Sequence, residues 1–174
     1  MSNQELFQLL AYTFPAIITA VIAYFFFKMH TENEEKRRRY LLHKEHHKDV
    51  LPLRLQAYER MALFLERIHP AKLLIRVTPF SDDKNDYERL LTHHIEQEFD
   101  HNLAQQIYIS DECWTVINTA KNSTIQNIRK ANMSDKVDSA NKLREVILSD
   151  LFDKTAPSQT ALSYVKSEVV QLFS

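Results

Sequence analysis

The sequence predicts an all-α fold, in which one N-terminal transmembrane helix continues into a charged stalk and an antiparallel helical bundle follows. Three observations predict it: the 174 residues include no glycine, an uncharged apolar run lies near the start, and apolar residues then recur with a helical period. Two-residue hairpins rely on glycine, so a β-rich fold is disfavoured. Glycine is also required by phosphate loops, dinucleotide-binding turns, nucleophile elbows and EF-hands, which are therefore excluded.

Charge and cysteine content further restrict the possible functions and the expected cellular compartment. The 22 Lys and Arg residues against 23 Asp and Glu residues give a net charge of −1, which argues against bulk binding of nucleic acid. Cys113 is the single cysteine, so no internal disulfide can form and a reducing compartment is expected.

The first element is a membrane anchor, expected over residues 1–30. From Leu6 to Phe27 the chain has 22 residues without a charge, enough to cross a hydrocarbon core of about 30 Å. Pro15 is tolerated here because neighbouring helices or Thr19 can satisfy the carbonyl that it frees. A cleaved signal peptide is disfavoured, because no Lys or Arg precedes the run and the run is too long.

The distribution of basic residues predicts the orientation. No Lys or Arg lies on the N-terminal side of the run, whereas seven follow it: Lys28, Lys36, Arg37, Arg38, Arg39, Lys44 and Lys48. By the positive-inside rule, we expect a bacterial inner-membrane protein with its N-terminus outside and its C-terminal domain in the cytoplasm.

Residues 31–50 are expected to form a charged juxtamembrane helix. Its basic residues 36–39 either hold anionic lipid headgroups or serve only as a topology determinant on a solvated stalk. Five acidic residues in the same segment favour the second interpretation.

Residues 51–174 are expected to form a bundle of about five helices. Pro52 is expected to begin a new helix over 53–68, and the run after Pro70 is either two helical turns or a short extended piece. Short connections predict antiparallel neighbours. The remaining helices are expected over residues 81–108, 111–132, 135–154 and 157–172, with Leu103, Ile107 and Val137 facing inward.

Three helix ends carry capping signals. Ser110 and Ser134 are expected to be N-caps, since each precedes acidic residues that suit a helix start. Asn132 is expected to take the left-handed conformation usually given to glycine at a helix end.

Two Glu-x-x-His pairs suggest an enzyme as an alternative. They are Glu66 with His69 and Glu98 with His101, a spacing that carboxylate-bridged di-metal bundles use. Such a site needs an inward Glu from each of two further helices, and the other helices offer only poor candidates. We therefore expect no metal ligands and no catalytic residues.

Cys113 falls in the first turn of a helix, where the dipole can lower the pKa of a thiol. Buried structural cysteines are commoner, so we expect a structural role. With no assembled nucleophile, the sequence predicts no enzyme, no cofactor and no small-molecule substrate.

The remaining hypothesis is a scaffold or accessory subunit of a membrane complex of the secretion, translocation or motility type. Its partner-binding surface is expected on residues 53–68 or on the polar face of residues 111–132. A docking factor for ribosomes or nucleic acid, acting through residues 36–39, is a further alternative, although no nucleic acid is expected. The candidate partner-binding residues are Arg54, Tyr58, Arg60, Arg67, Asn118 and Asn122.

The segment LPLRLQAYERMALFLERIHPAKLLIRV, from Leu51 to Val77, follows one membrane span and a charged stalk. In this arrangement the chain resembles an uncharacterised family of small single-pass Bacteroidota membrane proteins. The resemblance covers nearly the whole chain. It implies no activity, cofactor or catalytic residue.

Overall fold

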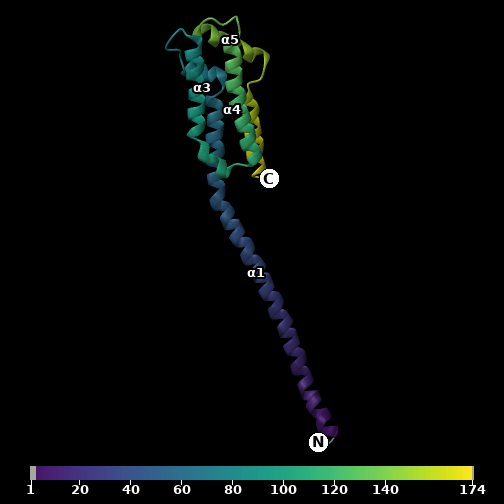
Figure 1. Ribbon diagram of the computed structural model, residues 1–174. Helices are drawn as coiled ribbons and strands as arrows, with labels where there is room; N and C mark the ends of the chain where they lie inside the picture. The colour runs from purple at the N-terminus through teal and green to yellow at the C-terminus, as the bar shows by residue number, and fades with distance from the viewer. Residues whose placement is uncertain (1–2, 174) are drawn as a thin grey trace. The chain divides into compact units, whose positions relative to one another are not determined.

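The computed structural model of the protein describes the backbone of residues 3–173 and the side chains of residues 12–38, 50–152 and 154–173. The described residues are all-α, without strands (Figure 1). The chain divides into two compact units, Met1–Val50 and Leu51–Ser174, which are described separately below.

Helix α1, Asn3–Arg67, supplies all of the described part of the first unit and the beginning of the second. The expectation that Pro52 begins a new helix is wrong, because α1 continues through this residue. Proline lacks an N–H for the carbonyl four residues earlier, but its fixed φ is compatible with a helix. The division between the two units nevertheless falls two residues before Pro52.

The first unit contains one candidate membrane span. Within the described residues, Tyr12–Arg38 includes a stretch that is long and apolar enough to cross a membrane, and none of that stretch is buried. Pro15 and Phe27 lie in this helix, whereas the side chain of Leu6 is outside the described residues. The hydroxyl of Thr19 donates to the carbonyl of Pro15 at 2.9 Å. The sequence had suggested that Thr19 can satisfy the carbonyl that Pro15 frees, four residues before the proline. The hydroxyl of Thr19 does not do so, because it donates to Pro15 itself.

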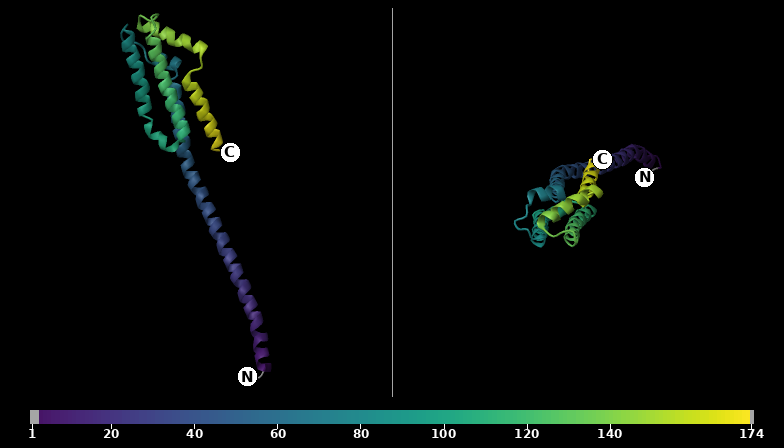
Figure 2. Two further views of the ribbon diagram at one scale, coloured as in Figure 1. Left: turned by 45° about the vertical axis from the view of Figure 1, so that its right-hand side comes forward. Right: turned by 90° about the horizontal axis from the view of Figure 1, so that it is seen from above.

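The second unit is a helical bundle. It comprises the C-terminal part of α1, then α2 (Pro70–Arg76), α3 (Lys84–Asp100), the 3₁₀ helix η1 (Leu103–Tyr108), α4 (Asp111–Asn132), α5 (Ala140–Asp153) and α6 (Pro157–Gln171). Helices α3, α4 and α6 run alongside one another, and α5 crosses one end of the bundle (Figures 1 and 2). Helix α4 packs against α3, α5 and α6.

Aromatic rings connect the first three long helices of the bundle. The centroid of the Phe99 ring lies 5.6 Å from that of Phe64 in α1 and 5.2 Å from that of Trp114 in α4. The amine of Lys121 lies 4.3 Å from the centroid of the Phe99 ring. Such contacts add to the stabilisation from apolar burial, so Phe99 fixes how α1, α3 and α4 pack.

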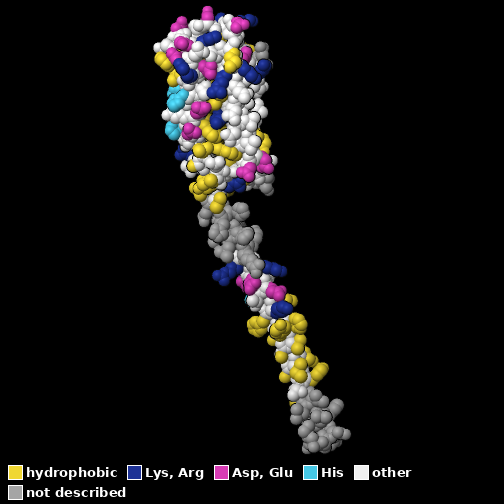
Figure 3. Space-filling model, viewed as in Figure 1, with side chains coloured by type: hydrophobic (Ala, Val, Ile, Leu, Met, Phe, Trp, Pro, Cys, Tyr) yellow, Lys and Arg dark blue, Asp and Glu magenta, His cyan; other side chains and the backbone are white. Residues whose placement is uncertain are grey.

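Helix α3 ends earlier than the apolar spacing predicts. The amide of Asn102 donates to the carbonyl of Glu98 at 2.8 Å, and this side chain competes with the backbone for the last carbonyls of the helix. The chain then continues as η1, in which Leu103 is 43% and Ile107 is 73% exposed. Their predicted inward orientation is wrong. Figure 3 shows apolar side chains gathered at this end of the bundle.

The predicted start of α5 is also wrong. Ser139 is the N-cap, because its hydroxyl accepts a hydrogen bond from the Lys142 N–H at 3.3 Å. Ser134 instead accepts from the Lys136 N–H, inside the preceding connection. Val137 is buried as predicted, but it lies before the helix.

Two further helix ends can be compared with the predictions. The Ser110 cap is confirmed, since its hydroxyl accepts from the Cys113 N–H at 3.1 Å. The predicted left-handed conformation of Asn132 is wrong, because α4 ends through Met133 with φ −74° and no described residue has a positive φ. A right-handed last turn needs no glycine, which fits the composition.

Candidate functional site

The two Glu-x-x-His pairs do not form a common site. The Glu98 carboxylate lies 2.8 Å from the Arg67 Nε and 3.7 Å from an Arg76 nitrogen. Glu66 is ion-paired with Lys72. Within the described residues, no group of three or more His, Cys, Asp or Glu side chains could hold a metal ion. Both carboxylates therefore balance nearby cations.

Cys113 is fully buried. Burial, together with the neighbouring Glu168 carboxylate, raises the pKa of its thiol far above the usual range. The thiol is protonated at neutral pH, so the helix dipole does not generate a nucleophile at this position.

The predicted partner-binding residues do not form one surface. Tyr58 is only 2% exposed, so its assignment to a surface is wrong. The Arg54 guanidinium donates to the Tyr108 carbonyl at 3.2 Å, and Arg67 belongs to the ion pair with Glu98. The remaining candidates are Arg60 and Asn122, which are exposed, and Asn118, whose amide donates to the Trp114 carbonyl.

Tyr58 instead belongs to a polar contact that joins α1 to α6. Its hydroxyl donates to the Glu168 carboxylate at 2.7 Å, and Arg54 lies 3.4 Å from the same hydroxyl. Burial and the bond to Glu168 raise the pKa of Tyr58 to about 12. The sequence offered no signal for this pairing, because the two partners are 110 residues apart.

The Glu168 carboxylate is held in its ionised form. Burial opposes ionisation, but hydrogen bonds with Ser110, Cys113 and Tyr58 and the charge of Arg54 outweigh it and lower the pKa of Glu168. The contact is therefore structural: a charged group of α6 interacts with donors from α1 and from the start of α4.

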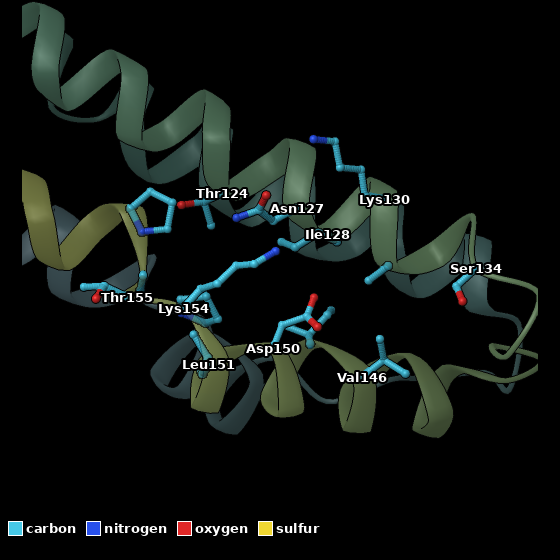
Figure 4. A pocket seen from close by; sticks show the side chains of 15 residues that line it. Thr124, Asn127, Ile128, Lys130, Ser134, Val146, Asp150, Leu151, Lys154 and Thr155 are labelled. Atoms are coloured by element: carbon cyan, nitrogen blue, oxygen red, sulfur yellow. The ribbon is translucent and has the colours of Figure 1, made fainter.

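A hollow with a mainly apolar lining lies between α4 and α5. It has a volume of about 340 Å³, and its apolar wall includes Ile128, Val146 and Leu151. In Figure 4 the side chains of Asp150 and Lys154 extend from the α5 side into this hollow, toward α4. Charged groups at the edge of an apolar cavity can orient a ligand that fills it.

Two further hollows continue from the first around the connection between α5 and α6. The second, of about 450 Å³, shares Lys154 and Thr155 with the first. The third, of about 250 Å³, shares His69 and Gln159 with the second. Together we call these three hollows the α5–α6 groove.

The α5–α6 groove has an excess of positive charge. Its lining includes four lysines against two acids, an excess of two positive charges, and Glu66 is already paired with Lys72. Phe152, which is 91% exposed, lies on its rim. The lining lysines are Lys72, Lys130, Lys154 and Lys166, and the acids are Glu66 and Asp150.

Sequence reasoning missed this groove. It identified the period-3.6 pattern of residues 135–154 but did not consider the charged pair Asp150 and Lys154. Phe152 follows Leu151 in the sequence, and only the structure shows that its side chain is exposed. The other walls come from residues near 70, 128 and 158, which only the tertiary fold brings together.

Fold and site together define an all-α protein that combines one candidate membrane helix with a bundle carrying a cationic, partly apolar groove. The chain belongs to a family of unknown function, DUF7935, whose model matches residues 4–172. The expected membership of an uncharacterised family is thereby confirmed. No curated protein and no solved structure matches the chain.

Proposed function

We propose that the protein is a non-enzymatic, single-pass inner-membrane protein whose bundle is an accessory or scaffold subunit of a larger membrane complex. A secretion, translocation or motility assembly is the expected type. The observation that carries the proposal is the presence, in one chain, of an unburied candidate membrane span and a bundle with an open, charged groove. The bundle faces the cytoplasm in this proposal, as the basic residues after the span favour.

The α5–α6 groove is the proposed binding surface. Its occupant is a segment of a partner protein that carries acidic and apolar side chains. The excess of lysines attracts acidic groups, and the apolar wall between α4 and α5 accepts an apolar side chain. The exposed Phe152 on the rim provides further apolar contact area.

Site-specific photo-crosslinking tests this assignment in intact cells. A photoreactive amino acid in place of Phe152 is expected to crosslink the full-length protein to one membrane-complex component, whereas the same probe in place of Asn122 is not. Asn122 is a matched control because it is exposed on α4 and does not line the groove.

The charge requirement is tested in the same cells. Lys154→Glu is expected to reduce the Phe152 crosslink at least tenfold, and the matched change Lys136→Glu is expected to leave it unchanged. Lys136 is exposed in the connection between α4 and α5. Equal crosslinking with both variants, or a crosslink only at position 122, would contradict the proposed surface.

A further inference from the structure

The third hollow of the α5–α6 groove contains polar atoms that lack partners. The hydroxyl of Ser158 and the Nδ1 of His69 are buried and have no hydrogen-bond partner among the described residues. Ser158 is 1% exposed, and both residues line the hollow. A buried donor without a partner is costly, so a polar ligand in the hollow would be stabilised by pairing with these atoms.

The start of α6 adds a positive potential at the same place. Ala156, the N-cap, gives no side-chain hydrogen bond, and Pro157 follows it. Ser158 and Gln159, both lining the hollow, lie in the first turn of α6. Pro157 has no N–H and the Gln159 N–H donates to the Ala156 carbonyl at 2.9 Å, so this turn favours a bound anion mainly through the helix dipole.

The charges around the hollow indicate the charge of the ligand. Lys72 and Lys166 contribute two positive charges, and Glu66 contributes one negative charge. Burial lowers the pKa of His69, so the ring is neutral at neutral pH. The net charge is therefore +1, which a monoanion balances and a phosphate dianion exceeds.

The remaining lining is apolar. Leu65 and Leu162 form part of the wall of this hollow, whose volume is about 250 Å³. We infer that the hollow between α1 and α6 binds a small aliphatic monocarboxylate: Ser158, His69 and Lys166 donate to its carboxylate, and the two leucines contact its chain. This inference goes beyond the proposed function and needs no partner protein.

The test uses the full-length protein in nanodiscs and sodium butyrate as the probe. Ring nitrogen signals of histidines are followed by NMR, with the His69 signal assigned through His69→Asn and empty nanodiscs as the blank. Butyrate is expected to shift the His69 signal with half-saturation on the order of 1 mM, as expected for so small a ligand. Butanol, butylammonium and inorganic phosphate are expected to give at least tenfold weaker effects.

Two variants connect the signal to the named donors. Ser158→Ala and Lys166→Gln are each expected to weaken butyrate binding about tenfold, since each removes a hydrogen bond to a charged group. The matched changes Ser167→Ala and Lys136→Gln are expected to have no effect. Ser167 is exposed and donates to the Tyr164 carbonyl instead. Lys166 is exposed, so its variant tests the site even if Ser158→Ala impairs folding.

Several results would overturn the inference. An equal effect of butanol would mean that the hollow is only an apolar cavity, and stronger binding of phosphate would exclude a monocarboxylate site. Tighter binding of a peptide with a free C-terminal leucine than of butyrate would mean that the site recognises a protein terminus. Absence of the Phe152 crosslink would contradict only the proposed partner surface, and absence of butyrate binding would contradict only the carboxylate site. The failure of one proposal can therefore be distinguished from the failure of the other.

Discussion

Glu168 shows how one side chain stabilises the bundle. It lies near the end of α6, yet the groups that satisfy its carboxylate belong to α1 and to the start of α4. Partly buried carboxylates are tolerated when donors surround them. The carboxylate therefore helps to close the bundle, and its protonation weakens the contacts of α6 with both α1 and α4.

The stability of the bundle should depend on this carboxylate at acidic pH. The pKa of Glu168 is lower in the folded state than its ordinary value of 4.5, so its contribution is present above about pH 4.5 and is lost as the pH falls below it. Glu168→Gln is expected to flatten this acid-induced loss of stability. Denaturant unfolding of the full-length protein in detergent between pH 7 and pH 3 measures it.

Tyr58, whose hydroxyl donates to Glu168, can be compared at neutral pH with Tyr164, a tyrosine of the same helix as Glu168. Tyr58→Phe should cost about 1 kcal/mol of the free energy of unfolding, because the Glu168 carboxylate loses a hydrogen bond. Tyr164→Phe, a change at a 39% exposed residue of the same helix as Glu168, should stay within about 0.5 kcal/mol.

For the prediction at acidic pH, parallel acid profiles of the Glu168→Gln variant and the unchanged protein would contradict the role assigned to the Glu168 carboxylate.

At the scale of elements, the apolar period identified most helices and misplaced some of their ends. Helix α4 was predicted in full, because Ile117, Ile125 and Ile128 follow one face and Ser110 is an unambiguous cap. The start of α5 was wrong because Ser134 and Ser139 both suit a cap, and only the fold selects between them. The end of α3 was wrong because the side chain of Asn102 takes a backbone carbonyl.

The groove could not be predicted in the same way. The walls of its third hollow come from residues 65–72 and 158–166, segments that are almost a hundred residues apart. Periodicity describes one helix at a time, so it contains no information on which two helix ends meet. Ser158 and His69 were therefore ordinary polar residues in the sequence.

The two candidate caps of α5 provide a direct comparison. Ser139→Ala should destabilise the protein by about 1 kcal/mol, because the Lys142 N–H loses its acceptor. Ser134→Ala should change the free energy of unfolding by less than about 0.5 kcal/mol. Denaturant unfolding of both variants measures this, and an equal or larger loss for Ser134→Ala would mean that the helix starts at the earlier serine.

At the scale of the whole molecule, the proposed membrane anchoring leads to a prediction of the side of the membrane that the bundle would face. The charge asymmetry around the span predicts the cytoplasm.

Thiol labelling in intact cells tests this orientation. In a Cys113→Ala background, Ser2→Cys should react with a membrane-impermeant reagent, and Phe152→Cys should react only after lysis. Residue 2 lies outside the described residues, whereas Phe152 is 91% exposed in the bundle. The reverse pattern would place the bundle outside and would remove the basis for a cytoplasmic partner.

The link between Tyr58 and Glu168 also has a consequence during synthesis of the chain. The two residues are 110 positions apart, so at 5–20 residues per second the carboxylate is made about 5–20 s after the tyrosine. For that interval the apolar stripe beginning at Ala57 has no α6 to cover it. A nascent chain of this protein therefore presents an unfinished bundle, and chaperones that hold apolar segments would have their main opportunity in those seconds.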